Sequence, residues 1–170
     1  MIERYSLPEM DAIFSDAARF ARYLEIELHA LDGQATIGAV PSSVASACRS
    51  RAPKVDEAFV REVSERETVT NHDVAAFVDV VQQRIGGAEA AWLHHGLTSS
   101  DVVDSAWCAM LRDAAELIDA ALGELVGVLV REARRHRDTP MIGRTHGIHA
   151  EPTTFGAKVA LWALQVDRDR

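Results

Sequence analysis

The stretch TSSDVVDSAWCAMLRDAAELIDAALGELVGVLVREARRHR, residues 98–137, decides the fold that the sequence predicts. It contains no proline, and it begins with the hydroxyl and carboxylate side chains that favour a helix N-terminus. Cationic side chains end it, where the negative end of a helix dipole stabilises them. Between these ends, apolar residues recur at alternating steps of three and four, which is the spacing of a heptad seam. We therefore predict one very long helix that packs against other helices of a bundle or against a partner subunit. The seam residues are Leu111, Ala114, Ile118, Ala121, Leu125 and Val128.

The residues before this helix predict a smaller helical domain. Apolar residues recur at helical intervals from Pro8 to about Leu31, with a possible new N-cap at Ser15, and Gly33 is expected to break the chain. Further helices are expected over residues 42–50, 56–67 and 74–85, the last one capped by Thr70-Asn71 and ended by Gly86-Gly87. The predicted fold class is all-α: a small N-terminal helical domain at 1–97, followed by the beginning of a long-helix bundle at 98–170.

The residues after the long helix lack periodicity. Thr139–Thr154 contains Pro140, Gly143, Gly147 and Pro152, and we expect an irregular loop there. A new helix is predicted from about Thr154 to Arg170, with no stop signal at its end. We therefore expect the sequence to be a fragment of a longer protein.

Composition limits the classes of function. A net charge of −8 argues against a nucleic-acid surface, because phosphate backbones require clustered Lys and Arg. No apolar run reaches the ~18 residues that a transmembrane helix needs, and the N-terminus lacks the pattern of a secretory signal. Cys48 and Cys108 lie in apolar contexts without a CxxC partner, so we expect two buried, reduced thiols in a cytoplasmic protein.

Three polar clusters interrupt the apolar helices and are candidates for chemistry. They are residues 71–73, 94–101 and 144–154, and they contain His72, His94, His146 and His149. Each histidine could instead be a structural side chain bonded to a carbonyl. The helix start at Thr98–Asp101 offers free backbone N–H groups that could hold a carboxylate or phosphate, although simple capping explains it equally well.

His146 is the strongest candidate for proton transfer. It follows Arg144-Thr145 and lies between two glycines that permit unusual backbone angles. An imidazole near pH 7 serves as a general acid or base. The HxxH spacing of His146 and His149 could suggest a metal instead, but no Cys or acidic ligand is suitably spaced. We expect neither a metal nor a cofactor.

Two long strings resemble one enzyme family. WLHHGLTSSDVVD, residues 92–104, and GRTHGIHAEPTTFG, residues 143–156, resemble the adenylosuccinate lyase family of the fumarase/aspartase superfamily. IERYSLPEM at residues 2–10 and HDV at residues 72–74 resemble the same family, in the same order along the chain. Sister families share the Arg-Thr-His motif, whereas the HAEPTTFG continuation is similar to adenylosuccinate lyases in particular.

The resemblance implies a reaction and a site. The expected reactions eliminate fumarate from adenylosuccinate, giving AMP, and from the succinylated aminoimidazole carboxamide ribotide of purine synthesis. His146 would protonate the departing nitrogen, and Thr145 and His72 are expected to be catalytic with it. The residues expected to bind the nucleotide substrate are Arg4 and Tyr5 for its phosphate, Thr98 and Ser99 for the succinyl carboxylate, and Asp73 and His94 in the pocket. The family also implies a homotetramer whose sites combine residues of three subunits.

Two departures from the family pattern stand beside these expectations. His95 occupies a position where an aromatic such as Tyr is expected, and the family's SSxMPxKxN loop with its serine base is absent from the 170 residues. The isolated chain is therefore expected to be inactive. The alternatives are another lyase of the superfamily, such as one acting on argininosuccinate, and a non-catalytic helical module whose heptad seam binds a partner.

Overall fold

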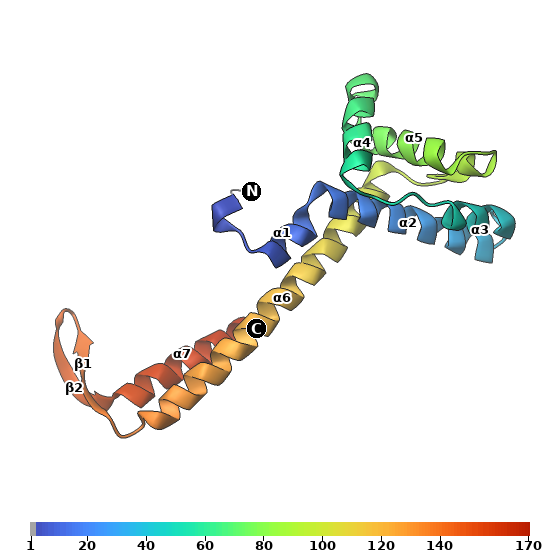
Figure 1. The fold of residues 1–170 in the computed structure, drawn as a ribbon. Helices are drawn as coiled ribbons and strands as arrows, with labels where there is room; N and C mark the ends of the chain where they lie inside the picture. Colours follow the sequence, from blue (N-terminus) through green and yellow to red (C-terminus); the bar gives the residue numbers. More distant parts are fainter. Residues whose placement is uncertain (1–2) are drawn as a thin grey trace. The chain divides into compact units, whose positions relative to one another are not determined.

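A computed structural model describes residues 3–170, and these form two compact units that divide between Asp113 and Ala114 (Figure 1). Ile2, the first residue of the N-terminal family string, lies outside the described residues. The first unit contains the short helices η1 (Glu3–Tyr5) and η2 (Glu89–Trp92), with α1 (Pro8–Phe14), α2 (Asp16–Thr36), α3 (Ser42–Ser50), α4 (Glu57–Thr70) and α5 (Asp73–Ile85). Helix α6 (Ser99–Arg135) begins in the first unit and continues into the second, which also contains β1 (Pro140–Thr145), β2 (Ile148–Thr154) and α7 (Phe155–Asp169). The predicted all-α class is confirmed, with one small hairpin added.

Side-chain caps explain where the helices of the first unit begin. The Ser15 hydroxyl accepts the N–H of Ala18 at 3.1 Å, so α1 and α2 are separate helices, as the sequence suggested. Asp56 caps α4 in the same way. At α5, however, the cap is His72, while Asn71 adopts the left-handed conformation that ends α4. The prediction of a Thr70-Asn71 cap was therefore wrong, since the cap is the next residue, and Asn71 instead adopts the left-handed backbone that a helix C-terminus needs.

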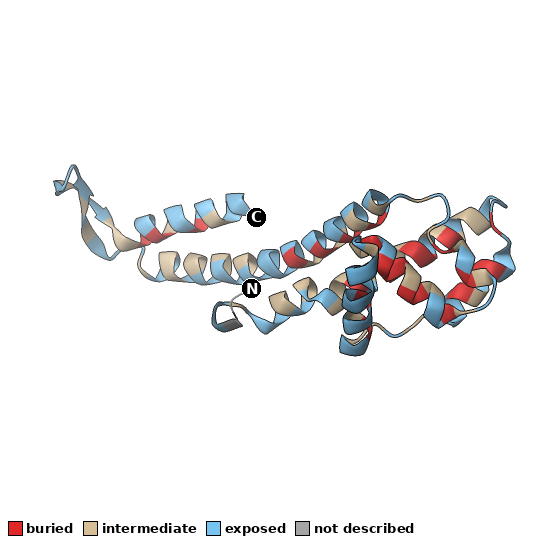
Figure 2. Cartoon of the chain, turned by 90° about the horizontal axis from the view of Figure 1, so that it is seen from above, coloured by how far each residue is buried: buried red, intermediate tan, exposed pale blue. Residues whose placement is uncertain are grey.

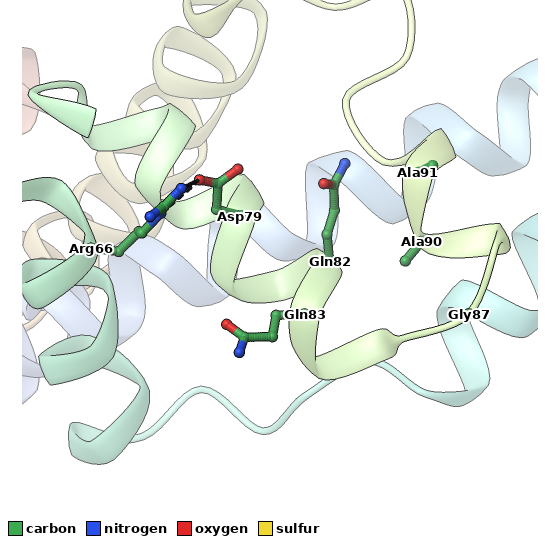
Figure 3. A pocket seen from close by; sticks show the side chains of 7 residues that line it. All are labelled: Arg66, Asp79, Gln82, Gln83, Gly87, Ala90 and Ala91. Atoms are coloured by element: carbon green, nitrogen blue, oxygen red, sulfur yellow. Dashed lines mark hydrogen bonds and ion pairs between the residues drawn. The ribbon is translucent and has the colours of Figure 1, made fainter. Parts of the chain in front are cut away.

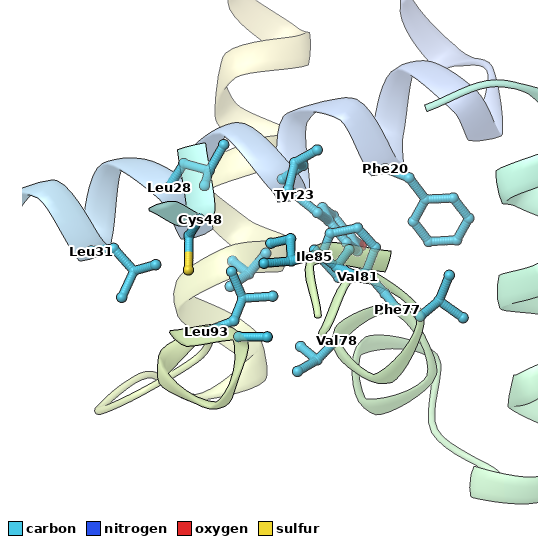
Figure 4. Close-up of a cluster of buried hydrophobic side chains, with 14 of the residues drawn as sticks. Phe20, Tyr23, Leu28, Leu31, Cys48, Phe77, Val78, Val81, Ile85 and Leu93 are labelled. Atoms are coloured by element: carbon cyan, nitrogen blue, oxygen red, sulfur yellow. The ribbon is translucent and has the colours of Figure 1, made fainter. Parts of the chain in front are cut away.

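The core of the first unit centres on α5. Figure 4 shows the side chain of Phe77 close to those of Phe20 and Tyr23 of α2. Phe77 stacks on Phe20 at a centroid distance of 5.7 Å and meets Tyr23 and Phe59 edge-on, at 5.5 and 6.0 Å. Offset and edge-to-face pairs of this kind stabilise a core beyond their buried area. In Figure 2 the buried residues gather in the helices of the first unit. The packing of this core therefore determines where the side chains around α5 lie.

The second unit is built on the C-terminal part of α6. Thr154 caps α7 by accepting the N–H of Ala157 at 3.1 Å, and α7 runs back alongside α6 (Figure 1). Backbone bonds from Phe155 to Thr139 and from Gly156 to His136, both 2.9 Å, join the start of α7 to the end of α6. Much of the α6 seam remains exposed within this chain, notably Ile118 at 52%.

Three local predictions need correction. Thr139–Thr154 forms an antiparallel hairpin, not an irregular loop, with His146-Gly147 as its two-residue turn. Gly33 does not break α2, which continues to Thr36, because an exposed glycine costs a helix only about 1 kcal/mol. Cys48 is buried, as expected, but Cys108 is exposed on α6.

Candidate active site

A cavity of about 500 Å³ lies between the start of α5 and the segment that leads into α6. It brings together His72, His94 and Ser99, three of the residues that the sequence assigned to the site. All three belong to the first unit. His72 comes from the cluster at residues 71–73, and His94 and Ser99 come from the cluster at residues 94–101. The remaining lining residues are Val74, Ala75, Val78, Asp79, Gln82, Ala91, Leu93, His95 and Gly96.

His72 reaches the cavity because it caps α5. Its Nδ1 accepts the backbone N–H of Ala75 at 3.4 Å, so in the neutral ring the proton resides on Nε2. Nε2 lies 3.3 Å from the hydroxyl of Ser99, which is in the first turn of α6. The cap therefore sets the tautomer, and His72 presents an N–H donor beside the start of a long helix.

His94 is held by a residue that the sequence analysis did not identify. The carboxylate of Glu27, on α2, accepts the backbone N–H of His94 at 2.8 Å and lies 2.6 Å from its Nδ1. His94 has a φ of 65°, in the left-handed region that few residues with a side chain adopt. Glu27 could have been noticed, because it lies at a core position of the apolar stripe that Tyr23, Leu24 and Leu28 form on α2.

Burial governs the charge state of Glu27. The side chain is fully buried, and loss of solvent raises the pKa of this carboxyl above its usual value of 4.5. The hydrogen bonds and charge of His94 act in the opposite direction. The contact between Glu27 and His94 therefore lies directly behind the cavity wall, and both of its side chains are ionisable.

The start of α6 has the geometry of a capped helix. Thr98 occupies the N-cap position, and the Asp101 carboxylate accepts the backbone N–H of Thr98 at 2.8 Å, which is half of a capping box. Ser99 lines the cavity, but Thr98 is exposed and is not among the lining residues. Of the two residues predicted for the succinyl carboxylate, the structure therefore brings only Ser99 to His72 and His94.

Arg4 and Tyr5 lie apart from these cavity residues, whereas the Asp73 Oδ1 lies 3.4 Å from the Nδ1 of His72. Asp73 follows His72 but lines a different cavity of about 350 Å³, together with Arg19 and Trp107. The Arg4 guanidinium carbon lies 4.8 Å above the ring of Tyr5, and the tyrosine is 73% exposed. Arg4 and Tyr5, both in η1, present polar groups to solvent, and the structure does not gather them with His72.

Thr145 and His146 belong to the second unit. Thr145 pairs with Ile148 across the hairpin, so His146 and Gly147 form the turn, with φ values of 50° and 77°. Positive φ at both positions is typical of a type I′ turn, which matches the twist of the two strands. The register slips by one residue between Ile142 and Arg144, and this bulge places Gly143 against the backbone of Glu151. The imidazole predicted to be the general acid is thus exposed at the tip of a well-defined hairpin.

A second cavity of about 550 Å³ adjoins the first along α5. Figure 3 shows its lining, in which Arg66 donates to the carboxylate of Asp79 at 2.7 Å. It shares Asp79, Gln82 and Ala91 with the first cavity. Arg66, the cation of the second cavity, is already paired with the Asp79 carboxylate. The second cavity therefore offers no anion site comparable with the cavity beside His72.

Within residues 3–170, no three His, Cys, Asp or Glu side chains are grouped so that they could hold a metal ion. In the same part of the chain, none of the helices combines the length and the apolar character needed to cross a membrane.

The sequence and the fold agree with a known class of enzymes. The chain belongs to the lyase family, whose sequence pattern matches residues 3–170. Among solved structures, the chain is similar to a fumarate lyase from a Mesorhizobium species, with a TM-score of 0.85 and 31% identity over 94% of this chain and 37% of that one. It is also similar to a β-carboxy-cis,cis-muconate cycloisomerase from Acinetobacter calcoaceticus, with a TM-score of 0.84 and 25% identity over 96% of this chain and 39% of that one.

Within this family, the chain is similar to adenylosuccinate lyases, which confirms the resemblance seen in the sequence. It is 45% identical to the adenylosuccinate lyase of Deinococcus radiodurans over 99% of this chain and 39% of that protein. It is 42% identical to that of Bacillus subtilis, again over 99% of this chain and 38% of the relative. The chain thus spans about two fifths of the length of the curated relatives it matches.

Proposed function

We propose that the protein to which this chain belongs is a carbon–nitrogen lyase that eliminates fumarate from adenylosuccinate, giving AMP. We extend this proposal to the succinylated aminoimidazole carboxamide ribotide, which carries the same succinyl-amine group. One observation supports it above the others: a single cavity is lined by His72, His94 and Ser99, which the family resemblance assigned to catalysis and substrate binding. The relatives at 42–45% identity carry the name of this activity.

The elimination has two requirements that these side chains suit. Removing the proton next to a carboxylate builds negative charge, and preorganised donors must meet it. The Nε2–H of His72, the Ser99 hydroxyl and the free N–H groups at the start of α6 are donors of this kind. Because the proposed substrate is anionic, we assign the binding of its succinyl carboxylate to these donors.

The departing nitrogen needs a proton, and we assign that role to His146 with Thr145 beside it. A positioned imidazole supplies such a proton for roughly 10²- to 10⁴-fold in rate. The hairpin supports the assignment, because a two-residue turn with both φ values positive holds the histidine backbone in one conformation. Arg4 and Tyr5 remain candidates for the nucleotide phosphate, Thr98 for the succinyl carboxylate, and Asp73 for the lining of the substrate pocket.

The proposed base is not among these residues. The 170 residues contain no SSxMPxKxN sequence, so the serine base would come from another part of the protein. We also propose that the protein is a homotetramer, as the family resemblance implies. The exposed apolar side chains along α6 support this proposal, among them Ile118, Leu125 and Val128. The cytoplasmic location and the inactivity of the isolated chain stay predictions.

The experiment uses the complete coding sequence and replaces His146 with Gln. Fumarate release from adenylosuccinate should fall by at least about 100-fold, because the general acid is lost, while the protein still assembles. His149→Gln is the matched control, since it removes an exposed imidazole from the same hairpin. Unchanged turnover in His146→Gln would contradict the assignment, and wild-type protein without fumarate release would favour the non-catalytic module, whose partner would bind the seam of α6.

A further inference from the structure

Within residues 4–170, Glu27 is the charged residue whose side chain is completely buried. A buried carboxylate is costly unless hydrogen bonds satisfy both of its oxygens. Here both bonds come from one residue, 67 positions away: Oε2 accepts the backbone N–H of His94 at 2.8 Å, and Oε1 lies 2.6 Å from the His94 Nδ1. The carboxylate therefore holds the main chain and the side chain of His94 at the same time.

The backbone of His94 needs such support. Its φ of 65° is unfavourable for a residue that carries a Cβ atom, and it persists only where surrounding contacts hold it. The N–H that Glu27 accepts belongs to this residue. The next residue, His95, is also fixed. Its carbonyl accepts the Gln34 side-chain N–H at 2.7 Å, and the imidazole ring of His95 packs on Trp92.

The contact also decides which ring nitrogen can exchange a proton. An ionised carboxylate only accepts hydrogen bonds, so Nδ1 of His94 must carry the hydrogen that meets Oε1. Nε2 has no hydrogen-bond partner within the described part of the chain, and His94 lines the cavity. His72, on the same cavity, has the opposite arrangement, with Nδ1 accepting from Ala75 and the proton on Nε2.

We infer that Glu27 is a positioning residue that holds His94 in the Nδ1–H tautomer, so that Nε2 alone gains and loses a proton at the cavity wall. His94 then offers a hydrogen-bond acceptor when neutral and a cationic donor when protonated. The protonated form suits an anionic group of the substrate. This consequence for substrate rests on the lyase function proposed above, whereas the tautomer itself does not.

The first test needs no substrate. The 170-residue chain is labelled with ¹⁵N in its histidine rings, and long-range proton–nitrogen NMR spectra identify the tautomer of each ring, with His94→Asn to assign the signals. The wild-type spectrum should show His94 as Nδ1–H and His72 as Nε2–H. Glu27→Gln, which keeps the side-chain volume but can donate to Nδ1, should move His94 toward Nε2–H. Glu25→Gln is the control, because Glu25 is on the same helix and pairs with Arg22 instead.

Two results of this test would overturn the inference. One is a wild-type His94 that is protonated on Nε2, as it would be if Glu27 itself held the proton. The other is a His94 spectrum that Glu27→Gln leaves unchanged. Because the wild-type tautomer is read directly, the inference stays testable even if the variant folds poorly.

The second test measures kcat and KM with the protein from the complete coding sequence. Glu27→Gln should lower kcat/KM by about 10- to 100-fold, as expected when one charge-assisted hydrogen bond is lost, and Glu25→Gln should not. An unchanged kcat/KM together with a reversed tautomer would refute the role in turnover. Wild-type protein without fumarate release would refute the proposed function, while the NMR result would still decide the tautomer.

Discussion

Replacing Gly156 with Ala should destabilise the second unit, although the same change stabilises most helices. Gly156 is in the first turn of α7, and a Cβ built on it would lie 2.4 Å from the carbonyl oxygen of Ala133 and 2.6 Å from the Cα of Arg137. Both contacts are backbone atoms at the end of α6, so no side chain can rotate away. The glycine is needed because two backbones approach closely there.

The magnitude follows from this geometry. To reach 3.4 Å, where ordinary contact begins, the Cβ must retreat by about 1 Å. That movement would stretch the bonds from Phe155 to Thr139 and from Gly156 to His136, both 2.9 Å, beyond the usual range. Two lost bonds cost about 1–3 kcal/mol, and the better helix propensity of Ala returns about 0.5–1 kcal/mol. The difference between these two ranges is about 0–2.5 kcal/mol, and we take its middle part, about 1–2 kcal/mol, as the expected net loss.

Hydrogen exchange measured by mass spectrometry gives the local stability of α7 and the hairpin. A loss of about 1–2 kcal/mol should accelerate exchange of their protected amides by about 5- to 30-fold. Gly127→Ala is the control in the same unit, because its Cβ would meet only the mobile guanidinium of Arg131, at 3.5 Å. That variant should gain about 0.5–1 kcal/mol. Equal or slower exchange in Gly156→Ala would refute the close-approach argument.

Two further predictions concern buried groups. Burial raises the pKa of Glu27, so the folded chain keeps a proton that the unfolded chain releases; the free energy of unfolding should therefore fall as the pH rises from 4.5 through the folded pKa. Urea titrations at several pH values should show this fall in the wild type but not in Glu27→Gln, and a difference independent of pH would contradict it. Cys108 is exposed, whereas Cys48 is fully buried, donates to the Glu89 carbonyl at 3.4 Å and has a pKa that burial raises. A thiol reagent followed by mass spectrometry should label Cys108 in the native chain and Cys48 only on unfolding; equal rates would be inconsistent with this structure.

The sequence predicted the helices well because their signals are local. Ser15 marked a new helix start, and the heptad spacing from Leu111 to Val128 predicted one long helix, which runs from Ser99 to Arg135. Local signals failed where two readings competed. Asn71 can begin or end a helix, and only its φ of 51° shows that it ends one. Cys108 has apolar neighbours in sequence, yet it lies on the exposed face of α6.

The hairpin was missed because its strands carry little of the usual strand pattern. Pro140, Gly143 and Pro152 interrupt them, and most of their side chains face solvent, so no alternation of apolar and polar residues appears. The turn does have a local signal, since Gly147 suits the second position of a type I′ turn. His146 at the first position is unusual, and its positive φ became visible only in the structure.

The sequence by itself determined the helical class, the long helix and the polar clusters that contain His72, His94 and Ser99, because caps and periodicity act over a few residues. Only the tertiary structure decided which of these clusters meet. The bond between His72 and Ser99 joins residues 27 positions apart, and Glu27 reaches His94 across 67 positions. Such contacts depend on how the helices pack around Phe77, so no local pattern could predict that a buried carboxylate supports the histidine at the cavity wall.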